Sequence, residues 1–160
     1  DVAVEDGRIA AIGSPGSLPG PGLDGEGLYL SHGFIDSHVH GGGGHDFMDA
    51  TREAWHGASA LHLRHGTTAM VPTTLAAGRD QLLAVFAAYR ACRSGFPDGA
   101  KFLGIHVEGP YLAPEQCGAQ DPAFIRDPDP EEYEALMEAC PDILRWTIAP
   151  ERPGAWRMGE

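Results

Sequence analysis

The chain has 160 residues, which is enough for one ordinary domain with a substantial core. Its 23 acidic side chains outnumber 11 basic ones and give a formal charge of -12, which argues against a nucleic-acid surface and against binding to an anionic membrane. The three cysteines form no Cys-x-x-Cys pair and are odd in number, so we expect a reducing, cytoplasmic compartment rather than a disulfide framework.

The first 30 residues differ in composition from the rest of the chain. Residues 1–12 alternate apolar and polar side chains around the turn sequence Glu5-Asp6-Gly7-Arg8, a pattern that predicts a β-hairpin. Residues 14–22 are rich in proline and glycine and predict a surface linker. We therefore expect one structural unit over residues 1–30 and another over residues 31–160.

From Leu28 onward the pattern alternates strand and helix, which is typical of βα units around a parallel sheet and predicts the α/β class. The predicted strands cover residues 34–40, 67–72, 102–108 and 144–149. Two predicted helices cover residues 51–65 and 79–93. In the second helix an apolar stripe at helical spacing predicts a buried face, formed by Leu82, Val85, Phe86 and Tyr89.

A third helix is marked by its start signals. Asp129 is a suitable N-cap, Pro130 suits the first helical position, and Glu132 stands where a capping-box partner is expected. The predicted buried face of this helix consists of Tyr133, Leu136, Met137 and Cys140.

His38-Val39-His40 lies at the end of the first predicted βα strand and is followed by four glycines, Gly41 to Gly44. Alternate side chains of a strand share a face and lie roughly 6.6 Å apart, so both imidazoles can reach one metal ion. The glycines let the backbone turn sharply and let a ligand approach closely. The alternative is that the two histidines are unrelated to each other.

Glu108 closes the third predicted strand, with His106 on the same face. A carboxylate at a strand end, aimed at the space that two imidazoles reach, would complete a metal site with His38 and His40. Zinc fits these donors best, although iron or manganese could occupy them too. The alternative is that Glu108 is a solvated edge residue and His106 a hydrogen-bonded core histidine.

Seven segments occur in the order found in one enzyme family. They are Gly33-Phe34-Ile35-Asp36, His38-Val39-His40 with its glycines, Asp46-Phe47-Met48-Asp49, Gly66-Thr67-Thr68, Pro72-Thr73-Thr74, His106-Val107-Glu108-Gly109-Pro110-Tyr111 and Gly118-Ala119-Gln120. Together they resemble the N-acetylglucosamine-6-phosphate deacetylases of the amidohydrolase superfamily. The His-x-His pair marks the superfamily, whereas the glycine run and the Glu-Gly-Pro-Tyr segment are more specific to the deacetylases.

The resemblance implies a partial (β/α)₈ TIM-type barrel over residues 31–160, comprising its first four βα units. The hairpin within residues 1–30 would belong to a small β-sandwich domain. A complete barrel typically needs about 250 residues, so we expect this chain to be the N-terminal part of a longer protein. Active sites of such barrels form at the carboxyl ends of the strands, where the candidate metal ligands lie.

The activity implied by the resemblance is metal-dependent hydrolysis of the acetamide of N-acetylglucosamine 6-phosphate, giving glucosamine 6-phosphate and acetate. Glu108 would be the principal metal ligand, and His38 and His40 would hold a second or shared metal. Ala119 and Gln120 match a segment that contacts the sugar, through the Ala119 backbone. Two alternatives stay open: another amidohydrolase acting on a cyclic amide or other acetylated amine, and a non-catalytic metal-binding remnant.

The family's further histidine ligands and its catalytic aspartate are expected beyond residue 160. No residue of this chain is therefore assigned as general acid or base, and we expect the piece alone to be inactive. The full-length protein is expected to be a homodimer, by resemblance.

Several charged or titratable side chains have no assigned role. Arg126 is the one candidate for the substrate phosphate, and its alternative is a solvated surface arginine. His45, next to the glycine run, could line the pocket. His56, His62 and His65 lie on a predicted helix and are expected to be surface or packing residues.

Overall fold

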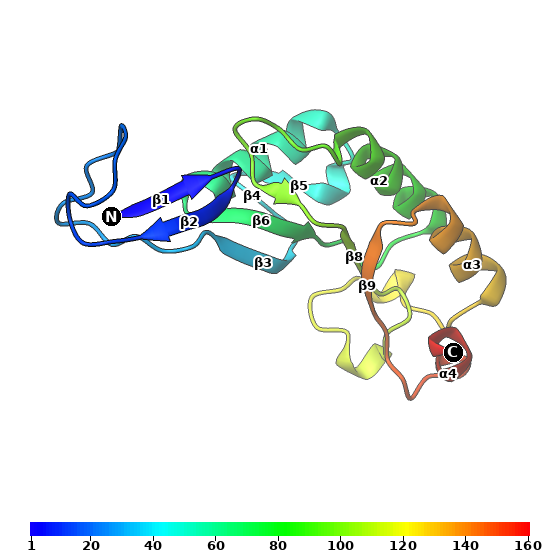
Figure 1. The fold of residues 1–160 in the computed structure, drawn as a ribbon. Coiled ribbons are helices and arrows are strands. Elements are labelled where there is room, and N and C mark those ends of the chain that lie inside the picture. The colour runs from blue at the N-terminus through cyan, green and yellow to red at the C-terminus, as the bar shows by residue number, and fades with distance from the viewer. The chain divides into compact units, whose positions relative to one another are not determined.

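The computed structural model describes residues 1–160, which divide into two compact units, Asp1–His32 and Gly33–Glu160 (Figure 1). In the first unit, β1 (Val2–Glu5) pairs with β2 (Arg8–Ile12) in antiparallel fashion, so the predicted hairpin is confirmed. Asp6 and Gly7 between the strands have φ angles of 50° and 73°. Positive φ at both central residues is what a tight two-residue hairpin turn requires, and Asp-Gly supplies it readily.

The second unit alternates strands and helices, which confirms the α/β class. Its parallel strands are β3 (Phe34–Val39), β6 (Thr67–Pro72), β7 (Lys101–Phe102), β8 (Ile105–Glu108) and β9 (Ile143–Thr147). Its α-helices are α1 (Arg52–Arg64), α2 (Arg79–Cys92), α3 (Pro130–Ala139) and α4 (Ala155–Gly159). A two-residue antiparallel pair, β4 (Gly41–Gly42) and β5 (His45–Asp46), lies between β3 and α1.

The parallel strands follow one another in chain order. β3, β6 and β7 form one three-stranded sheet, and β8 pairs with β9. A parallel bridge between Thr73 and His106 joins the end of β6 to β8. The helices α1 and α2 lie over one face of these strands, with α3 beside α2 (Figure 1). This succession of parallel βα units brings the ends of β3, β6 and β8 to one edge; closure into a barrel and the β-sandwich remain predictions.

The third predicted strand is not continuous, which corrects the prediction of one strand over residues 102–108. The chain breaks between β7 and β8 at Gly104, whose φ is 158°. A Cβ at this position would lie 2.9 Å from the Leu144 Cβ and 3.0 Å from the Asp142 carbonyl oxygen. Glycine therefore allows the close approach of the chain to Leu144 and Asp142 at this break, after which β8 pairs with β9.

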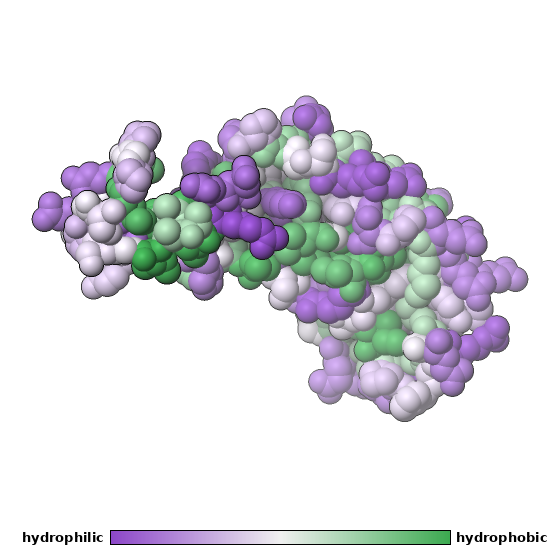
Figure 2. Space-filling model, viewed as in Figure 1, coloured by the Kyte–Doolittle hydropathy of each residue, from purple (hydrophilic) through white to green (hydrophobic).

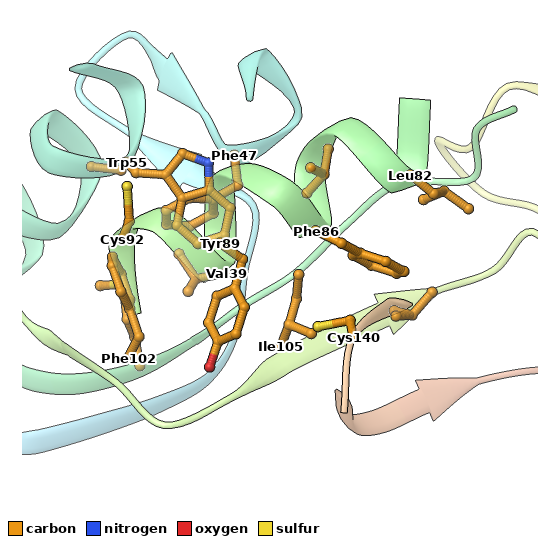
Figure 3. Close-up of a cluster of buried hydrophobic side chains, with 14 of the residues drawn as sticks. Val39, Phe47, Trp55, Leu82, Phe86, Tyr89, Cys92, Phe102, Ile105 and Cys140 are labelled. Carbon is orange, nitrogen blue, oxygen red and sulfur yellow. The ribbon is translucent and has the colours of Figure 1, made fainter. Parts of the chain in front are cut away.

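The core of the second unit is built around aromatic rings from α1, α2 and the segment after β5 (Figure 3). Trp55 is fully buried, with its ring centroid 4.8 Å from that of Phe47 and 5.4 Å from that of Phe102. The predicted stripe of α2 is buried as expected, because Leu82, Val85, Phe86 and Tyr89 all belong to this core. Val39 also packs into it, so the backbone between His38 and His40 is fixed from the core side.

The third helix confirms some of its predicted signals and corrects others. Asp129 caps α3 by accepting hydrogen bonds from the backbone N–H groups of Glu131 and Glu132, and Pro130 occupies the first turn. Glu132 is not the capping-box partner, because its carboxylate instead binds Arg126 and Tyr111. Met137 is 40% exposed, so the prediction that it belongs to the buried face of α3 was wrong.

Apolar side chains are also visible at the surface of the second unit (Figure 2). The most exposed large ones on its strands and connections are Phe34, Ile35, Leu103 and Leu144. Phe34 and Ile35 belong to β3, which has a strand partner on one side only. None of the helices combines the length and the apolar composition needed to cross a bilayer.

Candidate metal centre

The ends of β3 and β8 bring three potential metal ligands together. His38 and His40 are two residues apart at the end of β3, and their Nε2 atoms lie 3.1 Å from each other. Both face one oxygen of Glu108, the Oε2 atom, at 3.5 Å from His38 and 3.1 Å from His40. Their potential ligand atoms all lie within 4.8 Å of one another. The predicted convergence of strand ends therefore exists in the structure.

The separations suit a single bound cation. Two ligand atoms that bind one tetrahedral zinc ion at about 2.1 Å lie roughly 3.4 Å apart, and cis ligands of a six-coordinate ion lie somewhat closer. The three observed separations, 3.1, 3.1 and 3.5 Å, fall in this range. Two neutral nitrogen donors and one carboxylate are a typical donor set for a divalent metal. The residues fit a metal without rearrangement of the backbone.

Glu108 is held in place by the segment that follows β6. The Glu108 backbone N–H donates to the Thr74 hydroxyl at 3.2 Å. The Gln120 side-chain amide donates to Glu108 Oε2 at 2.9 Å, and the Gln120 carbonyl oxygen accepts from the Ala76 backbone N–H at 2.7 Å. The sequence did not predict these contacts, because Pro72-Thr73-Thr74 contributed only to the family resemblance.

His106 is a hydrogen-bonded core histidine and not a metal ligand. It is fully buried, and its ring packs edge-on against that of His38, with centroids 4.9 Å apart. Arg145 Nη2 lies 3.0 Å from His106 Nδ1, and because arginine can only donate, Nδ1 must accept. His106 Nε2–H then donates to the Thr147 hydroxyl at 2.7 Å. Burial, and then the charges of Arg145 and the two histidines, lower the pKa of His106 to about 4, so it is neutral at pH 7.

The glycine run forms the tight β4–β5 hairpin beside the site. A Cβ on Gly41 would collide with the His45 carbonyl oxygen, and Gly43 and Gly44 have φ angles of 64° and 82°. Glycine is needed at all three positions for this close turn. The ring of His45 lies against Gly57 of α1, and His45 is not one of the three potential ligands. That it lines the pocket stays a prediction.

The histidines of α1 have local partners, as expected for surface or packing residues. His56 pairs with Asp98 at 2.8 Å, and the His62 ring contacts the Gly41 carbonyl oxygen at 3.0 Å. His65 is the C-cap of the helix. None of them belongs to the group of potential ligands.

Arg126 is 31% exposed, and its guanidinium is occupied by partners within the protein. Its guanidinium donates to both carboxylate oxygens of Glu132, at 2.9 and 2.6 Å, and to the backbone carbonyl oxygens of Ala77 and Phe124. These hydrogen bonds to Glu132 raise the pKa of Arg126 against the opposing effect of burial. These contacts do not support Arg126 as the phosphate ligand, and the alternative of a solvated surface arginine holds only in part, since the side chain is 31% exposed. Arg126 fastens the loop after β8 to α3 and to the segment after β6.

The predicted sugar-contacting pair lies on that same loop, which runs from β8 to α3. Ala119 is exposed, and Gln120 is half-buried with its amide directed at Glu108. The structure thus places an exposed backbone segment next to the candidate ligands. The Gln120 side chain, by contrast, makes its hydrogen bond to Glu108 within the protein.

Comparison with known proteins confirms the resemblance inferred from the motifs. No protein-family model matches the chain. An N-acetylglucosamine-6-phosphate deacetylase from Lysinibacillus sphaericus is 36% identical over 160 residues, covering 96% of this chain and 40% of the relative. An N-acetylgalactosamine-6-phosphate deacetylase from Escherichia coli O157:H7 is 34% identical over 154 residues, covering 95% of this chain and 40% of the relative.

A solved structure gives the same result. A mutant N-acetyl-D-glucosamine-6-phosphate deacetylase from Mycobacterium smegmatis, in complex with N-acetyl-D-glucosamine-6-phosphate, matches 79% of this chain and 32% of its own length. The TM-score is 0.72 and the sequence identity 42%. The chain is thus homologous to sugar-phosphate deacetylases, and it spans about 40% of the length of the curated relatives.

Proposed function

We propose that the protein containing these residues is a metal-dependent deacetylase that hydrolyses N-acetylglucosamine 6-phosphate to glucosamine 6-phosphate and acetate. The observation that carries the proposal is the meeting of His38, His40 and Glu108 at the ends of two strands, in a chain homologous to such deacetylases. We also propose that the protein acts in the cytoplasm, on a sugar phosphate as its substrate. The complete fold we propose is a (β/α)₈ barrel with a small β-sandwich domain, and the assembly a homodimer.

The metal we propose is zinc, held by His38, His40 and Glu108, with iron or manganese as the other ions that suit the donors. A bound divalent ion would lower the pKa of water toward 7 and polarise the amide carbonyl, which is the chemistry that amide hydrolysis needs. The shared approach of both imidazoles to one Glu108 oxygen supports a common site for the three residues. The exposed Ala119 backbone supports its proposed role as a sugar contact beside that site.

The general acid and base are proposed to lie beyond residue 160, because the curated relatives are more than twice as long as the matched region. Within this chain no carboxylate other than Glu108 belongs to the group of potential ligands. The 160-residue piece is therefore expected to bind metal but to show no deacetylase turnover.

A second candidate substrate is N-acetylgalactosamine 6-phosphate. A relative named for that substrate is 34% identical to this chain, close to the 36% of a relative named for the glucosamine epimer. The two sugars differ only in the configuration of one hydroxyl group. Substrate assays with both epimers distinguish the two candidates.

Acetate release by the purified full-length protein tests the proposal. We expect turnover of N-acetylglucosamine 6-phosphate, loss of turnover after metal removal by a chelator, and recovery on adding Zn²⁺. N-acetylglucosamine without phosphate and the galactosamine epimer are the matched comparison substrates. Faster turnover of the epimer would transfer the assignment to it, and turnover of neither phosphate would contradict the proposal.

The number of metal ions is tested separately by metal analysis. We propose that His38 and His40 contribute to metal retention, so His38→Gln should lower the zinc content of the full-length protein. One equivalent of metal in the parent protein would reject the second metal at His38 and His40 that the resemblance allows. A metal content unchanged in His38→Gln would reject a role for this histidine.

A further inference from the structure

Gln120 connects Glu108 to a second strand end. Its amide N–H₂ donates to Glu108 Oε2 at 2.9 Å, and its carbonyl oxygen accepts from the Ala76 N–H at 2.7 Å. Ala76 is 5% exposed and follows Thr74, whose hydroxyl accepts from the Glu108 backbone N–H. The segment after β6 therefore holds Glu108 twice, once at its backbone and once at its side chain through Gln120.

The two partners leave the amide of Gln120 only one useful orientation. A carboxylate can only accept hydrogen bonds, and a backbone N–H can only donate. A flipped amide would place oxygen against the Glu108 carboxylate and N–H₂ against the Ala76 N–H, so both contacts would become repulsive. The Glu108 side chain is thus met by a donor whose own direction is fixed by the protein backbone.

The contacted oxygen is the one that faces the histidines. Glu108 Oε2 lies 3.1 Å from His40 Nε2 and 3.5 Å from His38 Nε2, and it also accepts the Gln120 hydrogen bond. A carboxylate oxygen has two lone-pair directions, so one remains for a cation after Gln120 uses the other. Without Gln120 the three torsions of Glu108 would be less restricted, and binding a metal would first have to order them.

We propose that Gln120 is a positioning residue, which holds the Glu108 carboxylate in the direction required for metal binding between His38 and His40. This inference rests on the metal site of the proposed function and assigns a role within it. The Ala119 backbone then remains the sugar contact, and the Gln120 side chain acts on the metal ligand instead of on the sugar.

The test is the Zn²⁺ affinity of the metal-free full-length protein, measured by competition with a chromophoric chelator. Gln120→Met keeps the length of the side chain and removes both hydrogen bonds. Partners that orient metal ligands typically contribute 10–100-fold to metal affinity, so we expect the zinc Kd to rise by about that factor. The matched control is Gln116→Met, on the same loop, where the exposed glutamine makes no side-chain hydrogen bond; its zinc Kd should not change.

A second variant separates loss of positioning from failure to fold. Gln120→Asn keeps the amide but is one methylene too short to reach both partners, and it should also weaken zinc binding while the circular dichroism stays that of the parent. An unchanged zinc Kd in either folded variant, with only a raised KM, would overturn the inference in favour of a direct sugar contact. That result would leave the proposed function intact, whereas a parent protein that binds no zinc would overturn both.

Discussion

Glu108 and the pair His38 and His40 meet at one point, but the protein supports them differently. The Glu108 side chain is 19% exposed, and the loop after β6 contacts both its backbone and, through Gln120, its carboxylate. The histidine side chains are 43% and 35% exposed, and they end β3, which has one strand partner. Moreover, His40 Nδ1 is buried without a hydrogen-bond partner.

This difference shows that the carboxylate and the imidazoles are held in position by different kinds of contact. The carboxylate is pre-organised by hydrogen bonds, whereas the imidazoles are placed by the strand backbone, by ring packing against His106 and by each other. Metal ligands are usually oriented by a hydrogen bond to their second polar atom, and His40 has none within the described chain. We therefore expect metal binding to depend more on Glu108 than on either histidine.

The largest effect is expected for Glu108→Gln, which keeps the shape of the side chain and removes its charge. Loss of the anion should weaken zinc binding by more than about 100-fold, beyond the effect typical of a residue that only orients a ligand. Chelator competition measures the zinc Kd, and Glu115→Gln on the exposed turn of the following loop is the matched control. A Kd for Glu108→Gln within tenfold of the parent would contradict the role of Glu108 as principal ligand.

A smaller effect is expected when one imidazole is removed. His38→Gln and His40→Gln should each weaken zinc binding by at least the roughly 10–100-fold typical of a residue that only orients a ligand, but by less than Glu108→Gln. The greater loss is expected for His40, which lies nearer to Glu108. His56→Gln, at an exposed histidine paired with Asp98, serves as the control for loss of a histidine elsewhere. If either variant lost more zinc affinity than Glu108→Gln, the histidines and not Glu108 would contribute most to zinc binding.

The histidine side of the site was open to prediction from sequence because its determinants are local. The period of a strand puts His38 and His40 on one face, and the glycines that follow can only mean a tight turn or a close approach. The boundaries of α1, α2 and β6 also lay within one residue or so of the predicted ones, since their periodicity and caps are properties of neighbouring residues.

The supports of Glu108 were not predictable in the same way, because they join residues far apart in the chain. Gln120 meets Ala76 across 44 positions, and Arg126 meets Ala77 across 49. The capping pattern around Asp129 suggested a local role for Glu132, but a bidentate arginine offers its carboxylate a stronger partner than a backbone N–H does. The break at Gly104 was missed for a similar reason, since it depends on contact with Leu144.

The Arg126–Glu132 pair tests whether the support on the Glu108 side also stabilises the fold. Arg126 and Glu132 are 31% and 15% exposed, and Arg126→Met would leave a half-buried carboxylate without its main partner. Breaking a fully buried pair costs about 3–5 kcal/mol, and partial exposure reduces the cost, so we expect a loss of about 2 kcal/mol in the free energy of unfolding. Urea denaturation of the metal-free protein measures it.

The control for this variant is Arg93→Met, which breaks an arginine–carboxylate pair on the surface. Arg93 is 61% exposed and pairs with Asp142 at 3.1 Å. Exposed pairs contribute about 0–1 kcal/mol, so the stability of this variant should stay close to that of the parent. An equal loss of unfolding free energy in Arg93→Met and Arg126→Met would mean that the Arg126–Glu132 pair stabilises the fold no more than an ordinary surface ion pair does.

The smallest effect is expected from acid titration of Glu132. Burial raises the pKa of its carboxyl group, but hydrogen bonds from Arg126 and Tyr111 outweigh burial and hold the pKa below its usual value. A carboxyl group with a lowered pKa stabilises the fold above the pKa of the unfolded chain, about 4.3, and this contribution is lost as the pH falls through the folded value. The stability difference between the parent and Glu132→Gln should therefore be largest near pH 7 and shrink below about pH 4. A stability difference between the parent and Glu132→Gln that stays constant from pH 7 to pH 3.5 would contradict this expectation. It would show that the charge of Glu132 does not contribute to fastening the loop after β8.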